Sequence, residues 1–143
     1  MADKTVSATR IIPAPPEAIF EVLADPAQHA AIDGSGSVQG VRGETERLRM
    51  GSRFGMRMRI GVPYFISNTV VEFEEGRRIA WRHFGRHIWR YELEPVTGGT
   101  KVTETFDWGP APGGAAYPLA GIPERNRKAM VATLERLEDH VTS

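Results

Sequence analysis

The first third of the chain changes from an alternating to a helical hydrophobic pattern, and prolines mark the change. From Thr5 to Ile12 apolar and polar residues alternate as in a half-buried strand. After a proline-rich stretch, Glu17 to Ala24 carries apolar residues at helical spacing, and a second short helical segment covers Ala27 to Ile32. Proline breaks a strand ladder but fits the first turn of a helix. The pattern therefore predicts a strand followed by two short helices.

The middle of the chain alternates with period two and predicts a series of antiparallel strands. The segment from Val38 to Met50 is only weakly strand-like. The clearest strand has Phe54, Met56, Met58 and Ile60 on one face and Arg53, Arg57 and Arg59 on the other. Gly61-Val62-Pro63 is expected to turn the chain. Further strands are predicted over Ile66–Glu74, Ile79–His83, His87–Leu93 and Thr100–Trp108.

The segments on either side of Phe84-Gly85-Arg86 are predicted to form a hairpin. Directly opposed residues of an antiparallel pair share a face, so a proposed register must suit both faces. One register gives the pairs His83–His87, Trp81–Trp89, Ile79–Tyr91 and Arg78–Glu92. Aromatic residues then meet on one face and opposite charges on the other, which supports this register.

The carboxyl-terminal segment from Pro123 to Val141 is predicted to be a long amphipathic helix. Its apolar positions are Met130, Leu134, Leu137 and Val141. One strand, two short helices, six more strands and a long helix predict an α+β fold in which a curved antiparallel sheet wraps around the helix. A single helix does not fill the concave face of such a sheet, so a void is expected between them.

Four passages of the chain resemble the START/Bet v 1-like superfamily. They are Ile12-Pro13-Ala14-Pro15-Pro16-Glu17-Ala18-Ile19-Phe20, Ala24-Asp25-Pro26-Ala27-Gln28-His29, Arg78-Ile79-Ala80-Trp81 and Gly98-Gly99-Thr100-Lys101-Val102-Thr103. The resemblance to these SRPBCC, or polyketide cyclase/dehydratase-like, proteins covers essentially the whole chain. It implies a single helix-grip domain over residues 1–143 with a ligand cavity. The superfamily includes cyclases, hydratases, lipid carriers, hormone receptors and chaperone activators, so the resemblance specifies the fold rather than one activity.

Composition narrows the set of partners and sites. The 18 basic residues balance 18 acidic ones, which argues against nucleic acid or an anionic membrane as the main partner. The absence of cysteine excludes disulfides, thiolate metal sites and cysteine nucleophiles. No apolar run approaches the length of a membrane span, and the amino terminus lacks a signal-peptide pattern. We expect a cytoplasmic protein without integral membrane association; a homodimer is left open.

Two strand faces are candidate walls of a ligand pocket. The methionine-rich face of the first clear strand suits an adaptable apolar wall, and the hairpin face would stack on a flat ligand and hydrogen-bond it. The expected ligand-binding residues are Phe54, Met56, Met58, Trp81, His83, Trp89, Tyr91 and Phe106. Plain core packing and a structural aromatic ladder explain the same two faces. No cofactor is expected, and no metal, because His83 and His87 supply only two of the three or four ligands that a site needs.

Glu104 is a candidate catalytic residue whose role depends on whether its side chain faces the cavity or the solvent. It shares a strand face with Val102, Phe106 and Trp108, which have the pattern of buried residues, and a carboxyl group in a dry cavity would act as a general acid or base. Simple pairing across the Pro95–Gly99 turn instead favours a solvent position opposite Arg90. A glycine bulge at Gly98-Gly99 would reverse that orientation. The catalytic residues therefore stay unassigned.

Two further groups of polar and charged side chains are most simply interpreted as solvent-exposed surface residues. His29 and Asp33 are four residues apart, so they would form an acid–base pair at the pocket mouth or, as the pattern favours, a helix-surface pair. Arg53, Arg57 and Arg59 are expected on the solvated side of the sheet.

Three functions are consistent with these observations. The favoured one is binding of a small hydrophobic or aromatic metabolite or lipid in the internal cavity. The first alternative is a cyclase- or dehydratase-type enzyme that uses a pocket histidine or glutamate. The second is a chaperone-regulating or protein-interaction module.

Overall fold

The computed structural model describes residues 4–42, 46–83, 87–110 and 121–143 of the chain. In order, the elements are β1 (Thr5–Ile12), α1 (Pro16–Leu23), the 3₁₀ turn η1 (Pro26–Gln28), α2 (His29–Ile32), β2 (Val38–Arg42), β3 (Arg53–Ile60), β4 (Val62–Glu74), β5 (Arg78–His83), β6 (Ile88–Val96), β7 (Gly99–Asp107) and α3 (Ile122–Thr142). Strand β1 has the predicted bounds. The other elements lie close to their predicted positions, except that β2 is shorter and β4 longer than expected. The predicted hairpin tip Phe84-Gly85-Arg86 lies outside the described residues.

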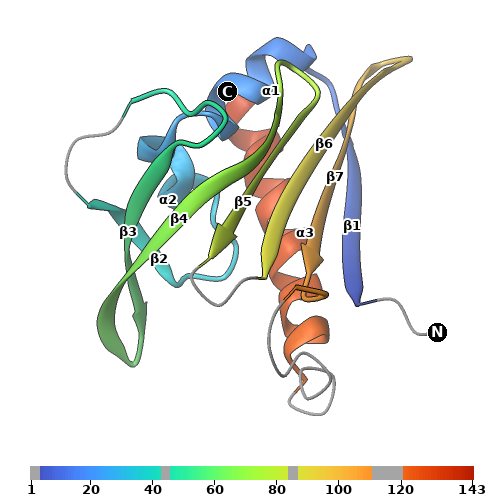
Figure 1. The fold of residues 1–143 in the computed structure, drawn as a ribbon. Helices are drawn as coiled ribbons and strands as arrows, with labels where there is room; N and C mark the ends of the chain where they lie inside the picture. The colour runs from blue at the N-terminus through green and yellow to red at the C-terminus, as the bar shows by residue number, and fades with distance from the viewer. Residues whose placement is uncertain (1–3, 43–45, 84–86, 111–120) are drawn as a thin grey trace.

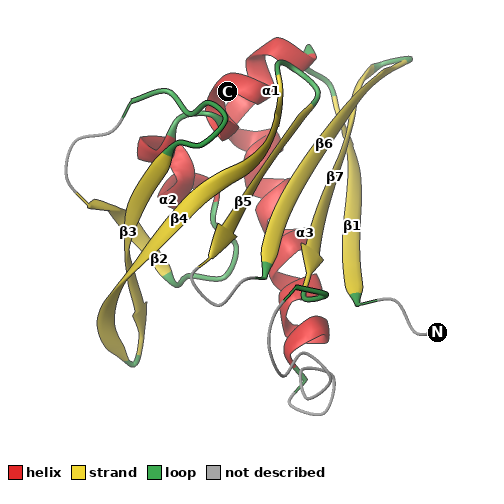
Figure 2. Ribbon diagram, in the orientation of Figure 1, coloured by secondary structure: helices red, strands yellow, loops and turns green. Residues whose placement is uncertain are grey.

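The seven strands form one antiparallel sheet in the order β1-β7-β6-β5-β4-β3-β2. The three α-helices all lie on one side of this sheet, and α3 runs along its concave face (Figure 1; Figure 2). Helix α3 packs mainly on β1 and β7, at one edge of the sheet. Helices α1 and α2 cover another part of the same side. The helix-grip architecture predicted from the sequence is therefore confirmed.

The amphipathic pattern of α3 determines how it packs on the sheet. Met130, Leu134 and Leu137 face the sheet and are almost completely buried, as predicted. Arg10 on β1 forms a salt bridge of 3.2 Å with Glu138, which ties the edge strand to the helix. In the described part of the chain, no helix has both the length and the hydropathy needed to cross a bilayer.

The turn between β6 and β7 contains only Thr97 and Gly98, because Val96 pairs with Gly99. Gly98 has a φ of 91°, a left-handed conformation that glycine adopts readily. A Cβ atom at Gly99 would collide with the carbonyl oxygen of Ile12, so this position also requires glycine. The resulting register differs by one residue from the simple pairing favoured by the sequence.

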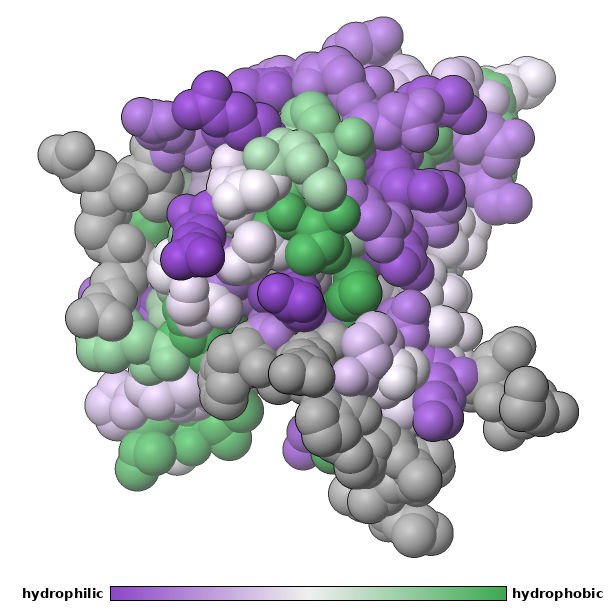
Figure 3. Space-filling view, in the orientation of Figure 1, coloured by the Kyte–Doolittle hydropathy of each residue, from purple (hydrophilic) through white to green (hydrophobic). Residues whose placement is uncertain are grey.

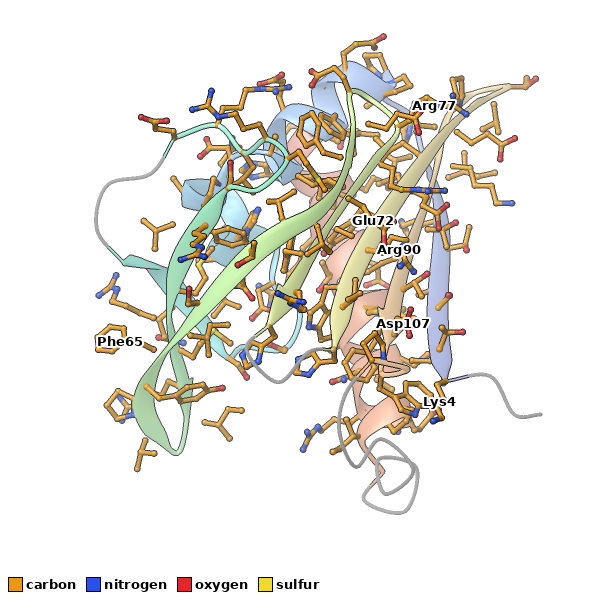
Figure 4. All side chains as sticks on the ribbon, in the orientation of Figure 1. Lys4, Phe65, Glu72, Arg77, Arg90 and Asp107 are labelled. Atoms are coloured by element: carbon orange, nitrogen blue, oxygen red, sulfur yellow. The ribbon has the colours of Figure 1, made fainter. Side chains whose placement is uncertain are left out.

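This register corrects the expected environment of Glu104. Arg90 lies opposite Thr105, whereas Tyr91 lies opposite Glu104. The Arg90 guanidinium instead binds Glu72, at 2.6 Å, on the outer face of the sheet, with Asp107 3.8 Å away (Figure 4). Glu104 points to the inner face. The solvent-side ion pair of Glu104 with Arg90 is therefore wrong.

Of the two other predicted hairpins, β5–β6 has the predicted register, whereas β3–β4 has a shorter turn than predicted. The β5–β6 register is confirmed, with Trp81 opposite Trp89 and Arg78 opposite Glu92. Between β3 and β4 only Gly61 turns the chain; the next two residues of the predicted turn already belong to β4. Because the strands continue beyond the core, Ile60 is 63% exposed, and the predicted apolar face of β3 is buried only at Phe54 and Met56.

Shortening Leu137 tests whether the α3 contact stabilises the fold. Leu137 is fully buried, so Leu137→Ala should lower the free energy of unfolding by about 2–5 kcal/mol, measured by urea denaturation. Val131 on the same helix is 40% exposed, and Val131→Ala is the matched control, with an expected loss below about 1 kcal/mol. Equal losses in the two variants would contradict this packing of α3.

Candidate functional site

Two rows of inward-facing side chains cross the centre of the sheet. The strand registers align Trp81, Trp89 and Phe106 in one row, and Ile79, Tyr91 and Glu104 in the next row. The rings of Trp89 and Phe106 lie 4.9 Å apart, and those of Trp81 and Tyr91 lie 5.7 Å apart. The sheet therefore carries a continuous aromatic surface on its concave side, with one carboxyl group beside it.

Helix α2 adds a histidine to this aromatic surface. The His29 ring stacks on Trp81, with centroids 4.9 Å apart and planes at 21°, and Phe54 meets both rings edge-on. His29 Nε2–H donates a 2.8 Å hydrogen bond to the carbonyl oxygen of Leu23, which leaves Nδ1 as the acceptor nitrogen. Burial lowers the pKa of His29, and this outweighs the opposing effect of the Leu23 carbonyl. At neutral pH His29 is an uncharged ring of the inner face.

The loop after α2 is built around Asp33 and Gly34. The Asp33 carboxylate accepts hydrogen bonds from the backbone N–H groups of Ser35 and Val38 and does not pair with His29, so the predicted His29–Asp33 pair is wrong. The Gly34 N–H donates to the Thr133 hydroxyl on α3 at 2.9 Å. A Cβ at Gly34 would lie 2.5 Å from the Thr133 nitrogen, so glycine allows the close approach. This contact anchors the loop to α3.

Glu104 is 4% exposed, and it is the only acidic residue in the described part of the chain that is less than a tenth exposed. The Tyr91 hydroxyl donates a 2.9 Å hydrogen bond to Glu104 Oε2, whereas Oε1 is buried without a partner among the described residues. Burial raises the pKa of Glu104 to about 8; the Tyr91 hydrogen bond opposes this and the negative charge of Asp33 adds to it. The carboxyl group is therefore mostly protonated at neutral pH. Because Tyr91 donates to Oε2, the proton belongs on Oε1.

His83 and His87 form a second group at the end of the β5–β6 hairpin. Their rings stack with centroids 4.7 Å apart, and the His87 ring also lies 5.3 Å from that of Phe106. Burial, aided by the charge of His83, lowers the pKa of His87 to about 4, and burial lowers that of His83. The Nδ1 atom of His87 is buried without a partner in the described part of the chain. No cluster of three metal-ligating side chains occurs in that part.

Comparison with known proteins places this geometry in a family. A family model described as "Polyketide cyclase / dehydrase and lipid transport" matches residues 3–142. The chain belongs to this family. An uncharacterized Mycobacterium tuberculosis protein, Rv0088, is 35% identical over 140 residues, which cover 94% of this chain and 62% of that protein. The chain thus spans less than two thirds of the length of this relative.

Solved structures agree on the fold of this polyketide cyclase/dehydrase and lipid transport family member. The AHSA1-like protein from Aeromonas hydrophila superposes with a TM-score of 0.73 at 20% identity, covering 96% of this chain and 92% of that one. Protein NE0264 from Nitrosomonas europaea gives a TM-score of 0.79 at 17% identity, covering 99% and 96% of the two chains. At these identities the likeness establishes the helix-grip fold alone.

The structure places all the expected ligand-binding residues of this family member on the inner face. Among them Phe54, Met56, Tyr91 and Phe106 are buried, and Met58, Trp81, His83 and Trp89 are half-buried. The sequence pattern favours a helix-surface position for His29, and this is wrong because the ring is buried against Trp81. One signal pointed inward: His29 precedes the buried Ile32 by three residues, so the two share a helical face.

The pH dependence of stability tests the burial of Glu104. Between its ordinary pKa of 4.5 and its native value of about 8, the native protein keeps a proton that the unfolded chain has lost. The free energy of unfolding must therefore fall as pH rises through this range, by up to about 1.4 kcal/mol per pH unit. The histidines with lowered pKa act in the opposite direction, but only below about pH 6.5.

The measurement is urea denaturation of the wild type and Glu104→Gln between pH 6.5 and 8. The wild type should lose stability relative to Glu104→Gln across this window. The exposed Glu94 provides the control, since Glu94→Gln should follow the wild type. Parallel curves for the wild type and Glu104→Gln would show that Glu104 is ionised at neutral pH, contrary to this account.

Proposed function

We propose that the protein binds a flat, mostly apolar ligand on the concave face of the sheet and hydrogen-bonds a carbonyl or hydroxyl oxygen of that ligand through Glu104. The observation that carries the proposal is the buried Oε1 atom of Glu104, which lies beside an aromatic surface and has no hydrogen-bond partner among the described residues. A buried polar atom without a partner costs about 1–3 kcal/mol. A protonated carboxyl group recovers this free energy when it donates to a ligand oxygen.

The aromatic side chains supply the apolar part of the binding surface. Trp81 and Trp89 face the side of the sheet that the helices cover, yet both are only half-buried. Inward-facing side chains would be fully buried if the helices filled the concave face. Their remaining exposed surface therefore supports an open volume that a flat ring system would occupy, with stacking on the indole rings.

The family supports this choice in general terms, because its description joins cyclase and dehydrase activity with lipid transport. It leaves the ligand open. The inner face favours a ring system over a plain acyl chain, since aromatic rings line it and a hydrogen-bond donor lies among them. His29, held neutral by burial, contributes a further ring and no charge.

A second candidate function is acid–base catalysis on the same ligand. With a pKa of about 8, Glu104 exchanges its proton within the physiological range, as an efficient general acid or base must. The Tyr91 hydroxyl fixes Oε2, so Oε1 is the atom that would give or take a proton. In a cyclisation the carboxylate would remove a proton next to a carbonyl group, and in a dehydration the acid would protonate the departing hydroxyl.

Binding is tested with 1,8-dihydroxyanthraquinone, a flat ligand with oxygens, and with anthracene, which has none. Quenching of tryptophan fluorescence reports both affinities. Glu104→Leu should weaken anthraquinone binding by about tenfold, the loss of one hydrogen bond, and leave anthracene binding nearly unchanged. Glu104→Gln keeps a neutral donor and should bind the anthraquinone within about threefold of the wild type.

The control is Glu94→Gln, which should not alter either affinity because Glu94 is exposed on the sheet. No quenching by either compound would refute the ligand-binding proposal. Equal effects of Glu104→Leu on both compounds would refute the polar role of Glu104 while leaving an apolar site.

Catalysis is tested with 5-nitrobenzisoxazole, which opens to a cyanophenolate once a base removes its ring proton. The rate should rise with pH around a midpoint near 8 as Glu104 ionises. Glu104→Gln should lower kcat/KM by about a hundredfold or more, with Glu94→Gln as the control. A rate that Glu104→Gln leaves unchanged would rule out Glu104 as a base and would not affect the binding proposal.

A further inference from the structure

The β3–β4 hairpin projects beyond the rest of the sheet. Strand β5 pairs with β4 no further than Asn68, and β2 pairs with β3 no further than Met58. Among the described residues, the segment from Ile60 to Ser67 is thus a two-stranded ribbon, and Figure 1 shows its tip at the lower left, away from α3. A free ribbon of this kind has little hydrophobic support of its own.

The tip of this hairpin is apolar and exposed. Ile60 is 63%, Val62 68% and Phe65 55% exposed. Among the described residues they are three of the six exposed large hydrophobic side chains, the others being Ile11, Met50 and Val131. Figure 3 shows hydrophobic residues gathered at the lower left, where the hairpin ends, and Figure 4 shows Phe65 pointing away from the sheet. Exposed apolar residues concentrated on one projection indicate an interaction site.

Arg57 and Arg59 lie beside the projecting part of the hairpin. From Arg47 to Val71 the sequence contains five arginines and no acidic residue, and three of the five lie on β3. Arg53, Arg57 and Arg59 lie on the outer face of β3, all exposed, and form no salt bridge with any residue that the structure describes. By contrast, salt bridges engage Arg10, Arg47, Arg49, Arg77, Arg78, Arg90 and Arg127. The hairpin is therefore positively charged next to its projecting part, although the chain as a whole has a net charge of zero.

We propose that this hairpin docks the protein on the surface of an anionic phospholipid bilayer. Ile60 and Val62, at the end of the hairpin, enter the boundary between headgroups and acyl chains. Phe65, which pairs with Arg57, lies at the level of the headgroups, where Arg57 and Arg59 contact phosphate and carboxylate groups. Arg57 lies three residues before Ile60, or about 10 Å along an extended strand. Interfacial segments insert about 5–10 Å, so an inserted tip leaves this guanidinium among the headgroups.

The distribution of charge favours a membrane over a second copy of the chain. Two hairpins brought together would oppose their unpaired arginines, and like charges in contact disfavour such a dimer. An anionic bilayer instead offers negative charge and an apolar interior in the same layered order as the hairpin. Overall neutrality argues against a membrane as a partner of the whole surface, but the attraction acts within a Debye length and depends on local charge.

Vesicle co-sedimentation tests the charged part of the surface. The wild type should bind phosphatidylcholine vesicles that contain 30% phosphatidylserine, bind pure phosphatidylcholine weakly, and release in high salt. Replacing Arg57→Gln and Arg59→Gln together should lower the partition coefficient about 25-fold, since each arginine near an anionic surface contributes about fivefold. The control carries Arg125→Gln and Arg136→Gln, which remove equal charge from exposed positions on α3 and should bind normally.

Site-specific fluorescence tests the apolar tip. The chain has no cysteine, so Val62→Cys and the control Ile11→Cys each accept one nitrobenzoxadiazole label. The Val62 label should become brighter and blue-shifted on phosphatidylserine vesicles. Ile11 is 56% exposed on β1, an edge strand separated from β4 by three strands, and its label should not respond.

Three results would overturn the proposal. They are no binding to anionic vesicles, equal losses in the hairpin and α3 charge variants, and a salt-sensitive dimer that the hairpin substitutions dissociate. The last would make a second copy the occupant. The proposal does not rest on the interior ligand site. Glu104→Leu should therefore bind vesicles like the wild type.

Discussion

The interior of this protein depends on the two-residue turn between β6 and β7. Because Val96 pairs with Gly99, Tyr91 lies opposite Glu104 and Trp89 lies opposite Phe106 on the concave face. A shift of one residue would move Glu104 to solvent and leave the inner row without a carboxyl group. The turn itself is fixed from both sides, by the left-handed conformation of Gly98 and by the contact of Gly99 with the Ile12 carbonyl. Backbone geometry at this turn thus places a carboxyl group in the core.

Once Glu104 is inside, its surroundings decide its chemistry. Desolvation disfavours the carboxylate form of Glu104, and the negative charge of Asp33 disfavours it further. The hydrogen bond from the Tyr91 hydroxyl stabilises this form. Asp33 is held in place because Gly34 packs against Thr133 on α3. The two short helices therefore contribute to the site through the loop that follows them and through the His29 ring on Trp81. The result is a neutral donor within an aromatic surface.

The sequence predicts the architecture better than the site. Period-two alternation and the Trp81–Trp89 register predict the sheet, because both faces of a hairpin must be satisfied together. The orientation of Glu104 could not be predicted, because it depends on one residue in the length of a turn, and both lengths suit the local sequence. His29 was misassigned because a two-turn segment offers too few positions to define a buried face. The extended β3–β4 hairpin was missed because Val62 and Pro63 resemble turn residues.

The protonation state of Glu104 is the central claim, and it can be observed directly. With glutamate side chains labelled at Cδ with ¹³C, the resonance absent from Glu104→Gln identifies this residue, and its chemical shift is followed against pH. The account predicts a single titration with a midpoint near 8. A midpoint near the ordinary glutamate value of 4.5 would mean that Glu104 is ionised at neutral pH, and it would contradict both the buried donor and the function built on it.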